Sequence, residues 1–327
     1  MNSVSPILRR CLFLPILALM VASDSAAQEL DLRIVFSSNR GGNWDIYSMD
    51  MHGNNLLQLS DDPVSDEYPA CSPDGRRIAF NSNRGLTPEL YVMNSNGKNA
   101  IRLTHDSFQK GRPSWSPDGK RIVFASFRLP AANWEIYAIG ADGENEINLT
   151  QHKEPDLSPS WSPDGNEIAF VSMFDGGAFG SHHIFVMNAN GKGRRNLTGD
   201  TGLVNSFDPT WSPDGRKIAF RSLFNLESYE IYVMNAEGKE LERLTEESNS
   251  SMPAFSPDGS KIAFVSMREG GTDIYLMDAN GMNAVNLTRS PPGTASTSPS
   301  WLPRALAVNP KGKLPISWGV LKRTGHP

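Results

Sequence analysis

An all-β fold, a six-bladed β-propeller, is predicted by a short motif that recurs along the chain. Its clearest copy is Trp-Ser-Pro-Asp-Gly at residues 115–119, followed by the apolar run Ile-Val-Phe at 122–124. Near-copies lie at residues 71–80, 161–170, 211–220 and 255–264. Successive Asp-Gly pairs are 44, 46, 50 and 44 residues apart, and a period of ~40–50 residues suits a four-stranded propeller blade.

Each repeat contains four short segments that favour β-structure, which we name strands A to D. In the best copy, strand A ends at Trp115, and Pro-Asp-Gly then favours a tight turn: Pro presets φ, Asp bonds its own backbone and Gly accepts positive φ. Residues 122–124, 136–139 and 147–149 are rich in β-forming side chains and give strands B, C and D. Asp142-Gly143 between C and D is a hairpin signal.

Strands B and C are apolar at consecutive positions, as in the Ile-Ala-Phe and Ile-Tyr-Val-Met segments, rather than at alternate ones. This pattern is typical of strands that are packed on both faces. In a propeller, each blade is covered by its two neighbours, and this arrangement supplies the double burial.

Every strand type occurs six times, which predicts six blades. Strands B begin at Ile34, Ile78, Ile122, Ile168, Ile218 and Ile262, and strands A are placed at Pro69, Pro113, Pro159, Pro209, Pro253 and Pro299. The chain opens with B, C and D of a blade that lacks A and ends with an unpartnered A at 299–301. We expect this last strand to pair with residues 34–36 and close the ring, which removes exposed sheet edges. A competing interpretation assigns residues 305–308 to an incomplete seventh blade.

The N-terminal residues 1–27 are predicted to be a signal peptide. Arg9 and Arg10 precede an apolar stretch at 11–22, and small residues lead to a cleavage site before Gln28. A buried helix of the fold is the alternative. We therefore expect a periplasmic or secreted protein with a propeller at 28–303 and a basic C-terminal tail at 304–327. No apolar run approaches the ~20 residues of a membrane helix.

Charge and cysteine content restrict the function further. Residues 28–303 hold 24 Lys and Arg against 35 Asp and Glu, a formal charge of −11. An acidic body argues against a nucleic-acid surface, because phosphate binding needs a basic face. Cys71 is the one cysteine after residue 27, so no disulfide within the mature chain is expected. It occupies the Trp or Phe slot of the motif and is interpreted as a small core residue rather than a reactive thiol.

These repeats resemble the WD40-like repeats of the TolB family. Pro-x-Trp-Ser-Pro-Asp-Gly, Ile-Ala-Phe, Ile-Tyr-Val-Met and Leu-Thr recur in fixed order over roughly residues 33–301. The resemblance implies a six-bladed propeller that is periplasmic, is not an enzyme and binds a partner at its channel mouth, where TolB binds the lipoprotein Pal. TolB also carries an α/β domain before its propeller. Only about five residues separate Gln28 from the first strand of this chain, so we expect that domain to be missing.

One face of the predicted ring is the better candidate for binding. Because adjacent strands are antiparallel, the short A–B and C–D turns share one face, and the longer, more variable B–C and D–A loops share the other. On that second face we predict contacts with a protein or peptide partner in the cell envelope, with a Pal-like lipoprotein as one candidate. The D–A loops supply Asp66, Glu67, Tyr68, Lys110, Arg112, Asp156, Phe207, Asp208 and Met252, and the longest B–C loop supplies Phe174, Phe179 and His182. A solvated rim with structural Asp caps is the alternative.

Arginines recur at one position of the B–C loops, at Arg40, Arg84, Arg128 and Arg268. Recurrence at the same repeat position favours a structural role over ligand contact.

Catalytic signatures are weak. His105, His152 and the pair His182-His183 are candidates for a metal site at the ring mouth, as in some propeller lyases, but they lack a fixed metal-ligand spacing. The nucleophile motif Gly-x-Ser-x-Gly is missing. We therefore predict a non-catalytic, monomeric interaction module with no metal and no cofactor. A carbohydrate-active or metal-dependent lyase-like propeller enzyme is the alternative.

Overall fold

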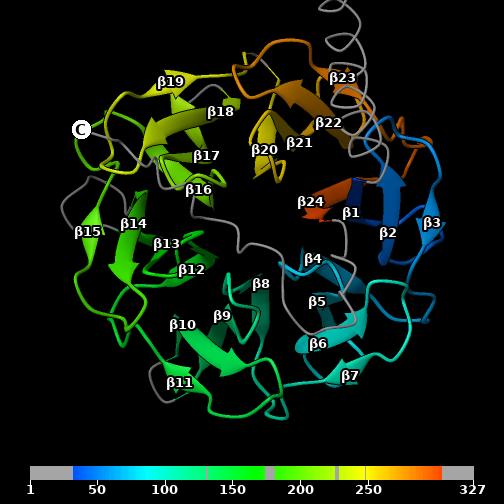
Figure 1. Ribbon diagram of the computed structural model, residues 1–327, viewed down its shortest axis with the longest axis horizontal. Coiled ribbons are helices and arrows are strands. Elements are labelled where there is room, and N and C mark those ends of the chain that lie inside the picture. The colour runs from blue at the N-terminus through cyan, green and yellow to red at the C-terminus, as the bar shows by residue number, and fades with distance from the viewer. Residues whose placement is uncertain (1–31, 130–131, 174–180, 225–227, 247, 304–327) are drawn as a thin grey trace, which may run out of the picture.

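The computed structural model describes residues 32–129, 132–173, 181–224, 228–246 and 248–303. These residues form 24 strands and no helix. The strands make six antiparallel sheets of four, which stand as blades around a ring (Figure 1). The predicted six-bladed all-β propeller is confirmed. The predicted signal peptide, the basic tail and the alternative strand at 305–308 lie outside the described residues.

Each blade runs from an inner strand beside the ring axis to a short outer strand. Blade 1 contains β24 (Ser296–Leu302), β1 (Arg33–Ser38), β2 (Asp45–Asp50) and β3 (Leu57–Gln58). Blade 2 contains β4 (Asp66–Cys71), β5 (Arg77–Ser82), β6 (Glu89–Asn94) and β7 (Ile101–Arg102). Blade 3 contains β8 (Lys110–Trp115), β9 (Arg121–Arg128), β10 (Asn133–Gly140) and β11 (Ile147–Asn148). Blade 4 contains β12 (Asp156–Trp161), β13 (Glu167–Met173), β14 (His182–Asn188) and β15 (Arg195–Asn196). Blade 5 contains β16 (Val204–Trp211), β17 (Lys217–Phe224), β18 (Ser228–Asn235) and β19 (Glu242–Arg243). Blade 6 contains β20 (Ser250–Phe255), β21 (Lys261–Ser266), β22 (Asp273–Asp278) and β23 (Val285–Asn286).

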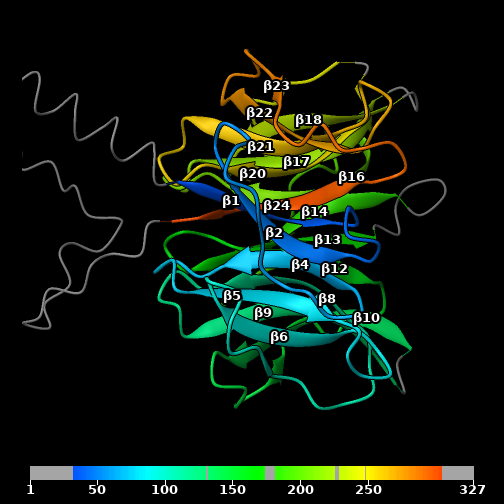
Figure 2. The same ribbon diagram turned by 90° about the vertical axis from the view of Figure 1, so that its right-hand side faces the viewer.

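The ring is closed by its last strand, as predicted. β24 pairs antiparallel with β1, so that Trp301 lies opposite Ile34, and the two strands run side by side in Figure 2. The Trp301 indole N–H also donates a hydrogen bond to the carbonyl oxygen of Ala254 in blade 6, at 2.9 Å. Residues from the two ends of the described chain therefore complete one blade and attach it to its neighbour.

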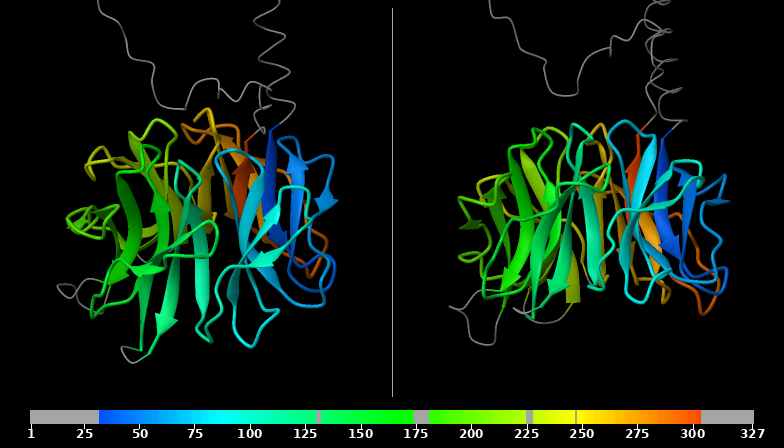
Figure 3. Two further views of the ribbon diagram at one scale, coloured as in Figure 1. Left: turned by 60° about the horizontal axis from the view of Figure 1, so that its bottom comes forward. Right: turned by 90° about the horizontal axis from the view of Figure 1, so that it is seen from below.

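The hydrophobic core lies between the blades. Ile34, Val35 and Phe36 are fully buried at consecutive positions, and the other second strands repeat this pattern. Between blades 4 and 5, Val171 and Ile184 pack against Phe220 in one cluster. Seen edge-on in Figure 3, the strands run between the two faces of the ring, with each sheet pressed against the next. The consecutive apolar residues thus predict correctly that each blade is covered on both sides.

The inner strands begin earlier than predicted. β4 starts at Asp66, so Asp66, Glu67 and Tyr68 lie in a strand and not in the D–A loop where they were predicted. The same correction applies to Lys110, Arg112, Asp156, Phe207, Asp208 and Met252. Proline usually ends strand pairing, but in these strands each proline sits at a bulge where no ladder hydrogen bond needs its missing N–H. In β4 the register with β5 shifts between Glu67 and Ala70, on either side of Pro69.

The residue before each of these prolines has a left-handed backbone. Its φ is 55° at Tyr68 and 39° at Arg112, although a residue before proline normally prefers extended backbone. The six equivalent residues, with φ between 39° and 57°, are Tyr68, Arg112, Ser158, Asp208, Met252 and Ser298. One bulge of fixed shape is therefore repeated in every inner strand.

Glycines in the C–D turns set how closely neighbouring blades approach. In the turn between β18 and β19, a Cβ added to Gly238 would lie 2.7 Å from the carbonyl oxygen of Leu197 in blade 4. The same contact with the preceding blade is made by Gly53, Gly97, Gly191 and Gly281.

Replacing Gly238 with Ala should loosen this contact. Gly270 has the same φ of 82° but has no atom within 4 Å of an added Cβ. We expect Gly270→Ala to cost about 1–2 kcal/mol in the free energy of unfolding, from left-handed strain alone. Gly238→Ala should cost about 1–3 kcal/mol more, because the methyl group overlaps backbone of the preceding blade. Urea unfolding of both variants measures the difference, and equal costs would show that the turn does not control blade spacing.

Candidate functional site

A cavity of about 1120 Å³ lies within the ring, lined by the inner strands of all six blades. Its walls are largely apolar and include Trp115, Trp161 and Trp301. It extends to the A–B turns, where Pro73 and Pro117 are among the lining residues. The cavity therefore lies toward the face with the short repetitive turns, opposite the face that was predicted to bind.

The bulged residues before the prolines all line this cavity, and two of them form an ion pair across it. Arg112 of blade 3 contacts Asp208 of blade 5, past the intervening inner strand of blade 4. The Arg112 guanidinium lies over the ring of Tyr68, 5.3 Å from its centroid. The Met252 backbone N–H donates a hydrogen bond to Asp208 at 3.3 Å. Four predicted site residues, Tyr68, Arg112, Asp208 and Met252, thus come together in the cavity.

Asp208 is nearly buried and serves a second arginine. Its side chain is 4% exposed, and its Oδ2 lies 2.9 Å from Nε of Arg221 on β17. Arg221 packs over the rings of Phe207 and Tyr229, at 5.0 Å and 4.6 Å from their centroids. Arg112, Asp208 and Arg221 therefore form a continuous charge chain, which we call the Arg112–Asp208–Arg221 triad.

Phe207 and His182 meet beyond this triad and do not line the cavity. Their rings are 4.7 Å apart, and Phe207 also contacts Tyr229 edge-on at 6.2 Å. Burial lowers the pKa of His182, so its neutral form is favoured. This aromatic cluster joins blades 4 and 5. Phe174 and Phe179 lie outside the described residues.

Three predicted contact residues have charged side chains that are buried inside the protein. Asp66 and Asp156 are completely buried, and Lys110 is 4% exposed. Asp66 pairs with Arg84 at 2.8 Å and Asp156 with Arg194 at 3.1 Å. Because these side chains already have partners inside the fold, they are structural. Glu67 is partly buried, and burial raises its pKa.

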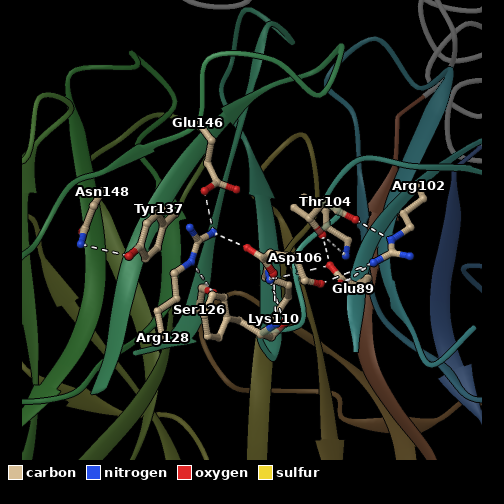
Figure 4. A network of polar contacts seen from close by, with 12 residues as sticks. Glu89, Arg102, Thr104, Asp106, Lys110, Ser126, Arg128, Tyr137, Glu146 and Asn148 are labelled. Atoms are coloured by element: carbon tan, nitrogen blue, oxygen red, sulfur yellow. Dashed lines mark hydrogen bonds and ion pairs between the residues drawn. The ribbon is translucent and has the colours of Figure 1, made fainter. Parts of the chain in front are cut away.

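Figure 4 shows the pairing of Lys110. Its ammonium group contacts Asp106 and lies 3.7 Å from Glu89 of blade 2. Arg128 of blade 3 reaches the same Asp106 at 3.1 Å. These charges connect neighbouring blades beneath the B–C and D–A loops.

Comparison with known protein families shows the family to which this chain belongs. Residues 31–130 and 121–309 match the family described as the TolB beta propeller domain, and together they span most of the chain. The protein belongs to the TolB β-propeller family.

Solved TolB structures have the same fold. TolB from Acinetobacter baumannii superposes with a TM-score of 0.75 at 22% identity, covering 88% of this chain and 72% of that one. A putative TolB from Agrobacterium tumefaciens gives 0.65 at 23% identity, covering 79% and 89%. An oligogalacturonate lyase from Vibrio parahaemolyticus gives 0.54 at 18% identity, covering 77% and 73%. A comparison with curated proteins gives no match.

In this TolB-family propeller, His183 has a local partner. Strand C of five blades has a buried carboxylate at or near its start, and in blade 2 Thr104 donates to Glu89 at 2.5 Å. Blade 4 has His183 in this position, with Nδ1 3.2 Å from Oγ1 of Thr198. In the part of the chain that the structure describes, no group of three or more His, Cys, Asp or Glu side chains lies close enough to hold a metal ion.

The recurring arginines of the B–C loops are structural, as their repetition indicates. Each lies over the aromatic pair of its own blade, at 5.3 Å from the Tyr47 centroid for Arg40 and 3.9 Å from Tyr137 for Arg128. Arg84 and Arg268 make the same contact. In blade 4, Arg194 takes this role from the outer side.

Sequence reasoning missed Arg221, Tyr229 and the importance of the residue before each proline. A signal was present, because Arg221 is the one cation at a position of strand B that is otherwise Ser, Asn, Ala or Val.

Two buried carboxylates meet between blades 1 and 2. Asp45 is 1% exposed, and burial together with the charge of Asp66 raises its pKa from 3.8 to about 6. Between roughly pH 4 and 6, the folded protein therefore binds more protons at this site than the unfolded chain does. The contribution of Asp45 to the free energy of unfolding therefore falls as the pH rises through that window.

Asp45→Asn should remove this pH dependence. Relative to wild type, the variant should gain stability between pH 4 and pH 7, because the amide never has to be ionised inside the protein. Urea unfolding at several pH values measures the difference. Asp278→Asn is the control of opposite sign, since a hydrogen bond from Lys261 lowers the pKa of Asp278. It should lose stability relative to wild type at pH 7 and not at pH 3. A pH-independent effect of Asp45→Asn would contradict the assignment.

Proposed function

We propose that this TolB-family protein is an exported, non-catalytic interaction module that holds a segment of a protein or peptide partner in its central cavity. The observation that carries the proposal is the cavity of about 1120 Å³, walled by strands and by tryptophans. Its backbone is fixed by inter-blade packing, so little ordering cost is expected on association. Largely apolar concave sites with a few converging polar groups are the usual form of binding sites.

The cavity is a better candidate than the loop face. Asp66, Lys110 and Asp156 are committed to ion pairs within the fold, whereas Tyr68, Arg112 and Met252 face the cavity. His182 and Phe207 remain the strongest contact candidates on the loop face, because they are only partly buried.

A cavity-filling variant tests the site. Ser158→Tyr puts a large ring into the cavity at a position where blade 2 already holds Tyr68 with nearly the same φ. We expect it to reduce retention of a partner from envelope extract about tenfold or more, because overlap of about 1–3 kcal/mol opposes entry. Leu86→Glu, at a fully exposed residue of a B–C loop, is the matched control and should retain the partner. The reverse outcome would move the site to the loop face.

We propose an envelope partner, with a Pal-like lipoprotein as one candidate and a monomer as the working form. Among the described residues, no helix is long and apolar enough to span a bilayer. When the full sequence is expressed in a Gram-negative host, we expect a released protein whose mass, measured by mass spectrometry, matches a chain that begins at Gln28. A retained, uncleaved chain in the cytoplasm would contradict export.

The second candidate is a lyase-like enzyme, favoured by the fold shared with an oligogalacturonate lyase. That similarity concerns the fold alone. Elemental analysis of purified protein separates the candidates: a stoichiometric transition metal, together with cleavage of oligogalacturonate, would support the lyase and overturn the interaction module.

A further inference from the structure

The charges of the Arg112–Asp208–Arg221 triad do not balance, whereas the other charged residues of the cavity lining, Asp74, Arg77 and Asp118, lie at or beside the A–B turns. Arg112 and Arg221 share the single carboxylate of Asp208, and among the described residues neither arginine has another ion pair. The triad therefore carries one excess positive charge. The propeller around it, residues 28–303, has a formal charge of −11.

Arg112 is the member of the triad that a ligand in the cavity can reach. It lines the cavity and its side chain is 26% exposed, whereas Arg221 does not line it. Only Nη1 of Arg112 bonds to Asp208, and the other N–H donors of the fork are not used in hydrogen bonds among the described residues. The contact with the Tyr68 ring and the bond to Asp208 hold the guanidinium group in place. A planar fork of this kind matches a carboxylate with two parallel hydrogen bonds.

We propose that Arg112 recognises a carboxylate group of a peptide segment that enters the cavity, with Asp208 as a positioning residue. The inference rests on the proposed function and names the chemistry of its ligand. One excess positive charge matches a monoanion, and the carboxylate of Asp208 opposes a dianion such as a phosphate group. The Met252 side chain and the tryptophan walls suit apolar neighbours of the carboxylate in the peptide.

The carboxylate can belong to an Asp or Glu side chain or to the C-terminus of the peptide, and two peptide formats distinguish these sources. Random decapeptides are displayed in two formats, one fused at both ends and one with a free C-terminus, and are selected on the full mature protein. Ser158→Tyr is the counter-target that removes peptides bound outside the cavity. Enrichment of Asp or Glu in the doubly fused format assigns a side chain, and enrichment confined to the free format assigns a C-terminal carboxylate.

The best peptide is then synthesised with its carboxylate and with the matching amide. We expect wild type to bind the carboxylate form about tenfold to a hundredfold more tightly, as a charge-assisted hydrogen bond gives. Arg112→Gln should bind both forms equally. Arg112→Lys keeps the charge without the fork and should retain only part of the preference. Arg268→Gln, at an arginine outside the cavity, should discriminate as wild type does.

The possible outcomes distinguish a failure of the role proposed for Arg112 from a failure of the proposed interaction function. Peptides that Ser158→Tyr excludes but that show no preference for a carboxylate would overturn the role of Arg112 and leave the interaction module standing. Discrimination that survives in folded Arg112→Gln would also overturn it, and thermal unfolding verifies the fold of each variant. Failure to select any cavity-dependent peptide would overturn both.

Discussion

Inter-blade packing is the constraint on which the remaining structure depends. The second and third strands of each blade bury apolar side chains on both faces, so a blade is stable only between two neighbours. Such a row of sheets has no exposed end only if it closes, and β24 closes it by pairing with β1. Closure also fixes the inner strands around the axis. The cavity is thus a consequence of how the blades bury their cores, and its shape is as rigid as the ring.

Within this rigid frame, one repeated backbone bulge determines which side chains line the cavity. Each inner strand has a bulge at the residue before its proline, where φ is left-handed. Such a conformation is disfavoured by about 1–3 kcal/mol for a non-glycine residue, and it persists because the surrounding sheet determines it. The backbone repeats in all six blades, but the side chains are Tyr68, Arg112, Ser158, Asp208, Met252 and Ser298. The fold supplies the same position six times, and the sequence changes only the chemistry there.

The repeated motifs were sufficient to predict the blade number, the strand order and the closing strand, because each is set by local turn chemistry and by apolar patterning. The burial of charged residues was harder to predict from the sequence. Asp66 and Lys110 look like solvated loop residues in sequence, yet both are buried. Arg84 comes from a B–C loop and Glu89 from a strand of blade 2, and only folding brings them to Asp66 and Lys110. The bulge was hidden as well, because proline ordinarily marks a strand boundary.

The fate of these charges explains why the triad stands out in an acidic protein. Beneath the loop face, carboxylates pair with arginines or Lys110, and some also accept hydrogen bonds from hydroxyl groups. These groups contribute to blade packing and have little capacity left for a ligand. In the triad the ratio is reversed, because two guanidinium groups share the one carboxylate of Asp208. A purely structural ion pair would need one arginine there. The second arginine keeps Asp208 occupied from behind, so Arg112 is held in place while its remaining donors stay available to the cavity.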